Sequence, residues 1–359
     1  PTITEKTLRP VILVGGESRR MGRPKAMLPW KGTTLLGHLV NRAKEAGFTD
    51  IIVSAHNQEQ LAQWDTSVEG VTFVYDDGER RGPLGGIVSS FLSGRSDAYA
   101  VIAVDMPLID FTRLRTWAKH LDGHVQGVVP TRKGERQPLG AVYDRTTWEK
   151  GRAQLRAQSY RLLDWLKTFE VREIAVDADA LMFQNMNTFE EYRLLRAKIA
   201  NHARKVPVVS IVAAKRKTGK TTLVEALVKE LSQRGLSVGL VKSDSHGFEM
   251  DRPDSDTDRA MNAGAQAVAI AGPNEYAMRV RTQKQMDVYQ ITQSMPVDVV
   301  LLETRSQGVM PMIEVCRPEY TEEYIGPDAE TLRRVDVTTL DQPGVIKEFA
   351  DLVQACIEH

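Results

Sequence analysis

The chain of 359 residues contains only two cysteines, Cys316 and Cys356, and seven histidines. So few cysteines exclude a disulfide framework and a cysteine-rich metal site, and they suit a reducing compartment. The histidines show no metal-ligand spacing. The sequence also lacks an apolar run of about 18 residues, so no membrane-spanning helix is expected. Its first ten residues are polar and unlike a signal peptide, and we therefore expect a cytoplasmic protein that does not act at a membrane.

The chain also lacks an excess of charge of either sign, since 47 lysines and arginines balance 47 aspartates and glutamates. Nucleic-acid-binding proteins are usually basic, so no nucleic-acid partner is expected. The length exceeds that of one ordinary domain of about 100 to 200 residues. Two domains are therefore expected.

What the sequence does contain, near its beginning, is an apolar run followed by a glycine-rich, basic loop. Residues 11–14, VILV, predict a buried strand, and the loop GGESRRMGRPK follows directly. Gly15 and Gly16 let the backbone turn tightly and bring its N–H groups close to phosphate oxygens. Arg19 and Lys25 add positive charge around them. The combination is typical of a nucleoside triphosphate site, and a basic surface loop beside a strand is the simpler alternative.

The rest of the first half alternates strand-like and helical patterns, as a mostly parallel α/β sheet requires. Thr33 and Thr34 are expected to cap a helix that Gly47 ends. Strands are expected, in chain order, at 50–54, 71–75, 98–104, 127–130 and 139–143. Helices are expected at 58–64, 84–92, 111–120 and 146–168. Sheets of this kind bind ligands beyond the carboxyl ends of their strands.

Acidic residues follow two of these strands. Asp105 comes after the third strand in a turn that Pro107 stiffens, and it is the candidate ligand of Mg²⁺, which takes one or two carboxylates together with phosphate oxygens and water. Asp76 and Asp77 follow the second strand, and one such carboxylate can accept hydrogen bonds from guanine N1–H and N2–H₂. The plainer alternatives are that Asp105 caps the following turn and that Asp-Asp-Gly is simply a turn.

These segments resemble, in the same order, the motifs of the molybdenum cofactor guanylyltransferases. The matching segments are the loop at 13–25, GPLGGI at 82–87, VDMP at 104–107, QPLGAVY at 137–143 and NMNTFEE at 185–191. The resemblance extends over about residues 8–197 and implies a Rossmann-like, glycosyltransferase-A-like nucleotidyltransferase domain over 1–200. It also implies the reaction. The terminal phosphate of molybdenum-loaded molybdopterin would attack the α-phosphorus of GTP, with Mg²⁺ as cofactor, and expel pyrophosphate.

The resemblance assigns roles to individual residues. It implies catalytic roles for Lys25, Arg19 and Asp105, with Asp105 as the metal ligand. The residues that it implies for nucleotide binding are Leu13, Val14, Gly15, Gly16, Lys25, Asp76, Gly82 and Asp105. Gln137, Asn185 and Asn187 offer amide groups to the pterin side. An Asn-x-Asn-Thr run before acidic residues is also typical of a helix cap, so that alternative stays open.

Two details leave the choice of nucleotide open. Gly15 and Gly16 form the pair found in the guanylyltransferases, where the cytidylyltransferase relatives carry Ala-Gly. Pro24 stands before Lys25, where the guanine group usually has an acidic residue, and in this the chain resembles the cytidine group. GTP is favoured. A molybdopterin cytidylyltransferase or another nucleotidyltransferase of the same fold is the alternative.

A second nucleotide site is predicted after a polar helical segment at 190–205, with a domain boundary near residue 205. Residues 208–213 predict a strand that leads toward TGKT at 218–221. A P-loop needs backbone N–H groups around the phosphates, a lysine for their charge and a hydroxyl for Mg²⁺. Ala214 stands where the first glycine of such a loop is usual. The residues expected at the phosphates are Gly219, Lys220, Thr221 and Thr222.

The second half resembles the P-loop adaptor of molybdopterin guanine dinucleotide biosynthesis. The matching segments lie at 238–265, 298–308 and 311–317, within an overall resemblance over about 206–355. It implies a P-loop NTPase-like domain over 206–359 that binds GTP. Glu303 would hold a metal through water, together with Thr221. Thr304 stands where the adaptor usually has glycine, so hydrolysis of GTP stays open.

Together the two resemblances predict a natural fusion of transferase and adaptor that acts in cofactor biosynthesis or delivery. The implied protein partners are a molybdopterin-inserting protein and molybdoenzyme apoproteins or their chaperones. A homo-oligomer formed through the second domain is one alternative for the quaternary structure. A function of another class, a GTP-binding carrier or scaffold with a vestigial transferase half, would bind GTP without forming a dinucleotide.

Overall fold

The structure is a computed structural model, and it describes residues 6–14, 24–76, 81–177, 181–184, 186–214, 219–244, 246–305, 308–317, 324 and 326–358. The chain divides into two compact units, Pro1–Phe189 and Glu190–His359. This division falls earlier than the boundary near residue 205 expected from the sequence. The reason is that α7 (Phe189–His202) buries Ala197 in the core of the second unit. No helix within the described ranges is long and apolar enough to cross a membrane.

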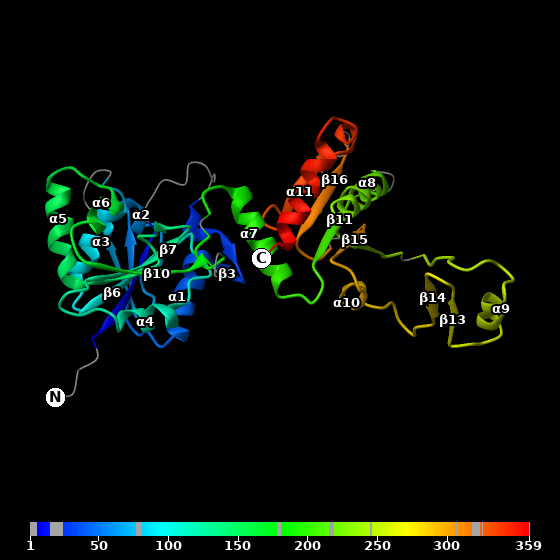
Figure 1. Ribbon diagram of the computed structural model, residues 1–359, viewed down its shortest axis with the longest axis horizontal. Helices are drawn as coiled ribbons and strands as arrows, with labels where there is room; N and C mark the ends of the chain where they lie inside the picture. Colours follow the sequence, from blue (N-terminus) through cyan, green and yellow to red (C-terminus); the bar gives the residue numbers. More distant parts are fainter. Residues whose placement is uncertain are drawn as a thin grey trace. The chain divides into compact units, whose positions relative to one another are not determined.

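The first unit is built on an eight-stranded sheet with the order β10-β7-β9-β6-β1-β4-β5, and β8 pairs with β7 (Figure 1). Its strands are β1 (Leu8–Leu13), β4 (Ile51–Ala55), β5 (Val71–Tyr75), β6 (Ala98–Ala103), β7 (Gly127–Arg132), β8 (Glu135–Arg136), β9 (Ala141–Asp144) and β10 (Val171–Ala175). β1 is parallel to both of its neighbours, whereas β9 runs antiparallel to β6 and β7. The expectation of a mostly parallel α/β sheet is confirmed.

Helices cover both faces of this sheet. On one face lie α3 (Gly82–Ser93), α5 (Trp148–Arg156) and α6 (Leu162–Leu166), and on the other lie α1 (Leu35–Glu45) and α4 (Phe111–Ala118) (Figure 1). As predicted, the Thr34 side chain caps α1 by accepting from the Gly37 N–H, and Gly47 follows the end of the helix with φ +91°. The first face buries an aromatic cluster of Tyr143, Trp165 and Phe169.

Two expected helices differ in the structure. The span 146–168 is broken into a 3₁₀ turn (Arg145–Thr147), α5 and α6, because Gln158 adopts the left-handed φ of 56° and cannot continue a helix. The expected helix at 58–64 shortens to α2 (Gln58–Leu61), since the next residues form three-residue turns such as Trp64 N–H to Leu61 O. The strand β10 was not expected.

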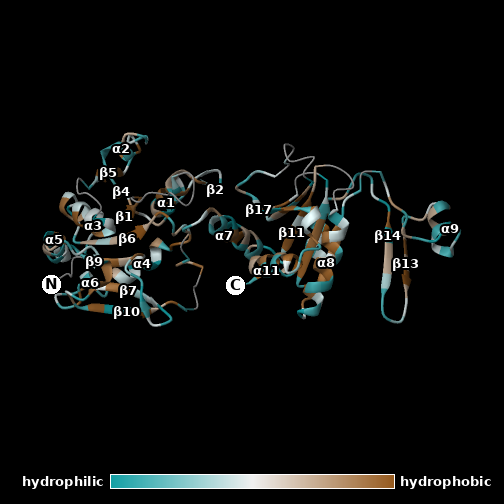
Figure 2. Ribbon diagram, turned by 90° about the horizontal axis from the view of Figure 1, so that it is seen from above, coloured by the Kyte–Doolittle hydropathy of each residue, from teal (hydrophilic) through white to brown (hydrophobic). Residues whose placement is uncertain are grey.

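The second unit contains a five-stranded parallel sheet with the order β12-β15-β11-β16-β17. Its strands are β11 (Val208–Val212), β12 (Val238–Lys242), β15 (Val299–Thr304), β16 (Met312–Cys316) and β17 (Thr331–Asp336). On one face, α8 (Lys220–Gln233) and α11 (Val345–Ile357) contribute to the main core. On the other, α10 (Val288–Ser294) packs against a smaller apolar cluster. In Figure 2 the apolar colour is concentrated on the strands of the two main sheets.

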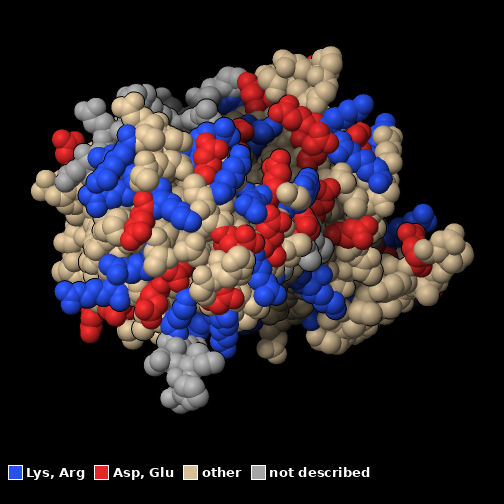
Figure 3. Space-filling view, turned by 60° about the vertical axis from the view of Figure 1, so that its left-hand side comes forward, with Lys and Arg blue, Asp and Glu red and all other residues tan. Residues whose placement is uncertain are grey.

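A small excursion interrupts the second unit between β12 and β15. It consists of α9 (Asp256–Asn262) and an antiparallel hairpin, β13 (Ala267–Ala271) with β14 (Tyr276–Val280). Large apolar side chains on this hairpin are exposed: Ile270 by 62%, Tyr276 by 77% and Met278 by 64%. Elsewhere, charged residues of both signs alternate on the face shown in Figure 3.

Candidate functional site

The strand order of the first unit locates a ligand site. From β1 the chain proceeds to β4 and β5 on one side and then crosses to β6 on the other side of β1. Ligands of open parallel sheets bind beyond the carboxyl ends of the strands at such a reversal. The basic loop leaves β1 there, and Asp105 follows β6. The loop residues Gly15, Gly16 and Arg19 lie outside the described residues.

Three of the predicted site residues meet at this edge. Lys25 begins a 3₁₀ turn (Lys25–Met27), and its Nζ lies 3.4 Å from Asp105 Oδ2 and 3.4 Å from Asn187 Oδ1. The Lys25 and Asp105 side chains are only 21% and 15% exposed, so water screens their attraction less than at an open surface. The fold thus joins a cation, a carboxylate and an amide from three distant parts of the sequence.

The turn that carries Asp105 is anchored to the neighbouring strand. The Val104 N–H donates to Leu13 O at 3.0 Å, and the Met106 N–H donates to Ala103 O at 3.1 Å. These bonds fix the backbone on both sides of Asp105. The carboxylate is therefore held at the carboxyl edge of β6, as the sequence predicts.

A single carboxylate with phosphate oxygens and water is a donor set that Mg²⁺ accepts. No group of three or more His, Cys, Asp or Glu side chains that could hold a metal occurs within the described part of the chain. Asp105 is partly buried at a strand end beside Lys25. This position fits a metal that is bound by the Asp105 carboxylate on one side and by triphosphate oxygens on the other. Asp105 is the residue that would hold it.

Asp76 lies at the same edge of the sheet. It follows β5, is 9% exposed, and its Oδ1 is 3.8 Å from Arg81 Nη1. Its Oδ2 lies against the first turns of α3, where the helix dipole favours negative charge. β1 and β4 lie between β5 and β6 in the sheet. At the usual strand spacing, β5 and β6 are therefore about 14 Å apart. One extended nucleotide can bridge that interval. Asp77 lies outside the described residues.

Other predicted nucleotide-binding residues serve the framework. Leu13 and Val14 are 8% and 5% exposed, so their side chains belong to the core. The Val14 N–H donates to Ser54 O at 3.0 Å, and Val14 O accepts from Gln60 Nε2 at 3.1 Å. Gly82 begins α3 with φ +61°, a backbone conformation that favours glycine. The contact of Gln60 with Val14 was not predicted, because nothing in the sequence distinguishes Gln60 from an ordinary surface residue of a helix.

The residues predicted for the pterin side do not all lie in the Lys25 cluster. Asn187 contacts Lys25, as described above. Gln137 lies between β8 and β9, where its N–H donates to Pro130 O at 2.8 Å and its Nε2 to Glu135 O at 3.4 Å. The described contacts do not join Gln137 to the Lys25 cluster. Asn185 lies outside the described residues.

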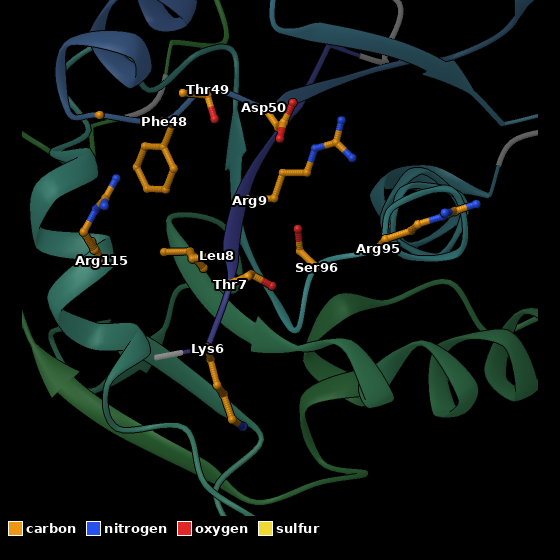
Figure 4. A pocket seen from close by; sticks show the side chains of 11 residues that line it. Lys6, Thr7, Leu8, Arg9, Phe48, Thr49, Asp50, Arg95, Ser96 and Arg115 are labelled. Carbon is orange, nitrogen blue, oxygen red and sulfur yellow. The ribbon is translucent and has the colours of Figure 1, made fainter. Parts of the chain in front are cut away.

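An open cavity of about 530 Å³ lies at the opposite, amino edge of the same sheet (Figure 4). Thr7, Thr49 and Ser96 line it just before β1, β4 and β6. Arg115 stacks on the Phe48 ring at 4.3 Å on one wall. None of the predicted site residues lines this cavity.

The residues predicted for the second nucleotide site lie around the start of α8. Gly219 precedes α8 with φ +97°, and a Cβ there would lie 2.0 Å from Val337 Cγ2, so only glycine fits. Lys220 is 9% exposed and its Nζ donates to Thr304 O at 3.0 Å. Burial lowers the pKa of Lys220, and the charge of Glu303 acts in the opposite direction.

The remaining predicted residues of this site flank the lysine. Thr221 and Thr222 are exposed in the first turn of α8. Glu303 is 6% exposed in β15, beside the strand that leads into the loop. Residues 215–218 lie outside the described residues. The described part therefore carries the lysine and the hydroxyl of the expected phosphate site, with an acid on the neighbouring strand.

Comparison with known proteins places each unit in a family. Residues 10–173 match the family described as "MobA-like NTP transferase domain", and residues 208–336 match "Molybdopterin guanine dinucleotide synthesis protein B". A relative from Bacillus cereus (strain B4264), named "Probable molybdenum cofactor guanylyltransferase", is 32% identical over 201 residues, covering 53% of this chain and 96% of the relative.

A relative of the same name from Bacillus mycoides (strain KBAB4) is 31% identical over 199 residues, with the same coverage of 53% and 96%. The crystal structure of molybdopterin-guanine dinucleotide biosynthesis protein A from Archaeoglobus fulgidus is 19% identical, with a TM-score of 0.44, and covers 52% of this chain and 95% of that one. The chain belongs, over its first half, to the molybdenum cofactor guanylyltransferase family, and it carries a MobB domain over its second half.

Proposed function

We propose that this chain transfers GMP from GTP to molybdenum-loaded molybdopterin and so forms molybdopterin guanine dinucleotide. A terminal phosphate oxygen of molybdopterin forms a bond to the α-phosphorus of GTP. The bond from that phosphorus to the bridging oxygen of the β-phosphate breaks, and pyrophosphate leaves. The observation that carries the proposal is the cluster of Lys25, Asp105 and Asn187 at the carboxyl edge of the sheet, in a chain of this family.

The cluster supplies what phosphoryl transfer needs, which is positioning and charge neutralisation rather than a protein nucleophile. Before ligands enter, Lys25 and Asp105 compensate each other's charge at 3.4 Å. On binding, the Lys25 ammonium faces the triphosphate, together with Arg19 from the loop. Asp105 would hold Mg²⁺, and a metal bound there would supply positive charge to the phosphates. Asn187 orients the acceptor or the Lys25 ammonium through its amide, with Gln137 and Asn185 as further pterin-side residues.

Guanine selection is assigned to Asp76. Its carboxylate, which is buried against α3, would accept from guanine N1–H and N2–H₂. Gly15, Gly16, Gly82, Leu13 and Val14 would take part in binding the rest of the nucleotide. Cytosine offers only its N4 amino group as a donor and cannot present a ring N–H and an amino group together to one carboxylate. The test is pyrophosphate release from GTP and from CTP with molybdenum-loaded molybdopterin, and with a sugar phosphate as alternative acceptor. Release that prefers CTP or the sugar phosphate would contradict the proposal.

The second unit is proposed to bind GTP through Gly219, Lys220, Thr221 and Thr222, with Glu303 acting on the metal through water. Its role is to assist delivery of the cofactor to molybdopterin-inserting proteins, apoproteins or their chaperones. The exposed side chains of Ile270, Tyr276 and Met278 support self-association through this unit. The two free cysteines support a cytoplasmic location. We propose 1–200 and 206–359 as the two functional domains. A fragment of the second unit should also include α7, because this helix packs into its core.

A further inference from the structure

His38 is a buried histidine in the middle of α1, 8% exposed. Its Nε2 lies 3.1 Å from the backbone oxygen of Pro107. Pro107 is two residues beyond Asp105, in the same turn after β6. The His38 side chain therefore reaches the backbone that carries the candidate metal ligand.

The same histidine also contacts the segment that carries Lys25. The Trp30 ring lies 5.9 Å from the His38 ring, tilted by 45°. Leu28 links this segment to α1, because its O accepts from the Leu35 N–H at 2.9 Å while its N–H donates to Lys25 O at 3.1 Å. One buried side chain thus touches both segments that meet in the Lys25–Asp105 pair.

The chemical state of the ring follows from its partner. A carbonyl oxygen only accepts, so His38 Nε2 carries the hydrogen and donates it to Pro107. Burial is the main reason that the pKa of His38 is lowered, which favours the neutral ring. Without this donor the buried carbonyl would lose its partner, and the turn would have reason to shift.

We propose that His38 is a positioning residue for nucleotidyl transfer: by donating to Pro107 O while packing on Trp30, it fixes Asp105 relative to Lys25. His38 touches neither substrate nor metal in this assignment. The inference rests on the proposed function for its kinetic readout. Small displacements of reacting groups, of about 1 Å, can cost about a hundredfold in rate.

The test compares His38→Leu and His38→Gln, each in the full chain, with the unmodified chain. Glutamine keeps an N–H donor at a similar reach, whereas leucine fills similar space without one. We expect His38→Leu to lower kcat about 10- to 100-fold and to change the KM for GTP less than about threefold. His38→Gln should recover most of that loss. Leu39→Ala, which empties a fully buried position on the same helix, controls for general destabilisation.

A second readout does not depend on catalysis. Mn²⁺ binding in the presence of GTP, followed by electron paramagnetic resonance, should weaken at least about fivefold in His38→Leu and recover in His38→Gln. Unchanged kcat and Mn²⁺ affinity in His38→Leu would overturn the inference, as would an equal loss in Leu39→Ala at matched folded fraction. If the unmodified chain forms no dinucleotide, the proposed function fails, and Mn²⁺ binding still decides the role of His38.

Discussion

Gly85 makes the position of Asp76 possible. A Cβ on Gly85 would lie 1.9 Å from Asp76 Oδ2, so the carboxylate occupies the space that any larger residue's side chain would need. Asp76 is 9% exposed and has little room to retreat. The candidate base-reading carboxylate therefore depends on a glycine in the neighbouring helix.

Replacing Gly85 with alanine should mimic the loss of Asp76. The new methyl group displaces the carboxylate from the guanine-reading position, so preference for GTP over CTP should fall by about 1 to 3 kcal/mol, or about 5- to 150-fold. In Asp76→Asn the preference for GTP over CTP should fall by a similar amount, because the amide replaces one of the two acceptor oxygens with a donor. Competition between GTP and CTP in the transfer assay measures this.

Gly123→Ala is the matched control, since nothing lies within 4 Å of a Cβ there. It should leave base preference unchanged. A folded Gly85→Ala protein with undiminished GTP preference would remove Asp76 from base recognition.

The metal assignment predicts a severe and selective defect in Asp105→Asn. An amide is a weaker Mg²⁺ ligand than a carboxylate and leaves Lys25 without its 3.4 Å counter-charge, so transfer should fall at least about 10²- to 10³-fold. Asp110→Asn is a suitable comparison, because Asp110 caps α4 and asparagine caps equally well. Initial rates across a Mg²⁺ titration check the prediction, and near-normal transfer by Asp105→Asn would refute it.

The two nucleotide sites should fail separately. Lys220→Ala removes the buried ammonium that donates to Thr304 O, so GTP binding by the second unit should weaken at least about tenfold while transfer by the full chain persists. Lys229→Ala, on an exposed position of the same helix, should change neither. Calorimetric GTP titration and dinucleotide formation are measured on the same preparations. If Lys220→Ala abolishes transfer as Asp105→Asn does, without unfolding, the two halves share one catalytic site.

The thiols should be inert in the folded protein. Burial raises the pKa of Cys316 to about 11 and that of Cys356 to about 12, against an ordinary 9.0. At pH 8 the reactive thiolate should be about 100-fold and 1000-fold scarcer, respectively, than in the unfolded chain. Iodoacetamide labelling followed by mass spectrometry should therefore be slow until urea is added.

The raised pKa values of the two thiols also determine how the stability of the fold changes with pH. The unfolded chain releases these protons near pH 9.0, whereas the folded chain retains them to higher pH, so their contribution to stability is present below pH 9 and is lost as pH rises. Labelling as fast in native protein as in urea would contradict the raised pKa of both thiols.

Local signals in the sequence predicted what depends on local structure. The helix from Leu35 begins after its threonine cap, as predicted. The strands before Asp76 and Asp105 coincide with the apolar runs from which they were predicted. The break near Gln158 could not be predicted, because a non-glycine residue with positive φ has no local signal in the sequence. The helix ends there with the Gln158 and Ser159 N–H groups donating to Leu155 O and Gln154 O.

Contacts between distant segments were also beyond the sequence. Lys25 and Asn187 are 162 positions apart, and no spacing rule relates them. Likewise, the place of α7 in the second unit depends on Asn201, whose buried side chain donates to Cys356 O and accepts from the Val208 N–H. Such bonds become visible only once both ends are placed in space.

Whether this one chain joins GMP to molybdopterin can be measured directly. The full chain is incubated with GTP, Mg²⁺ and molybdenum-loaded molybdopterin, with CTP present at equal concentration, and the pterin product is identified by mass. We expect a molybdopterin guanine dinucleotide with one pyrophosphate released per product. A cytosine dinucleotide, or GTP that is bound but recovered intact beside unmodified molybdopterin, would contradict it.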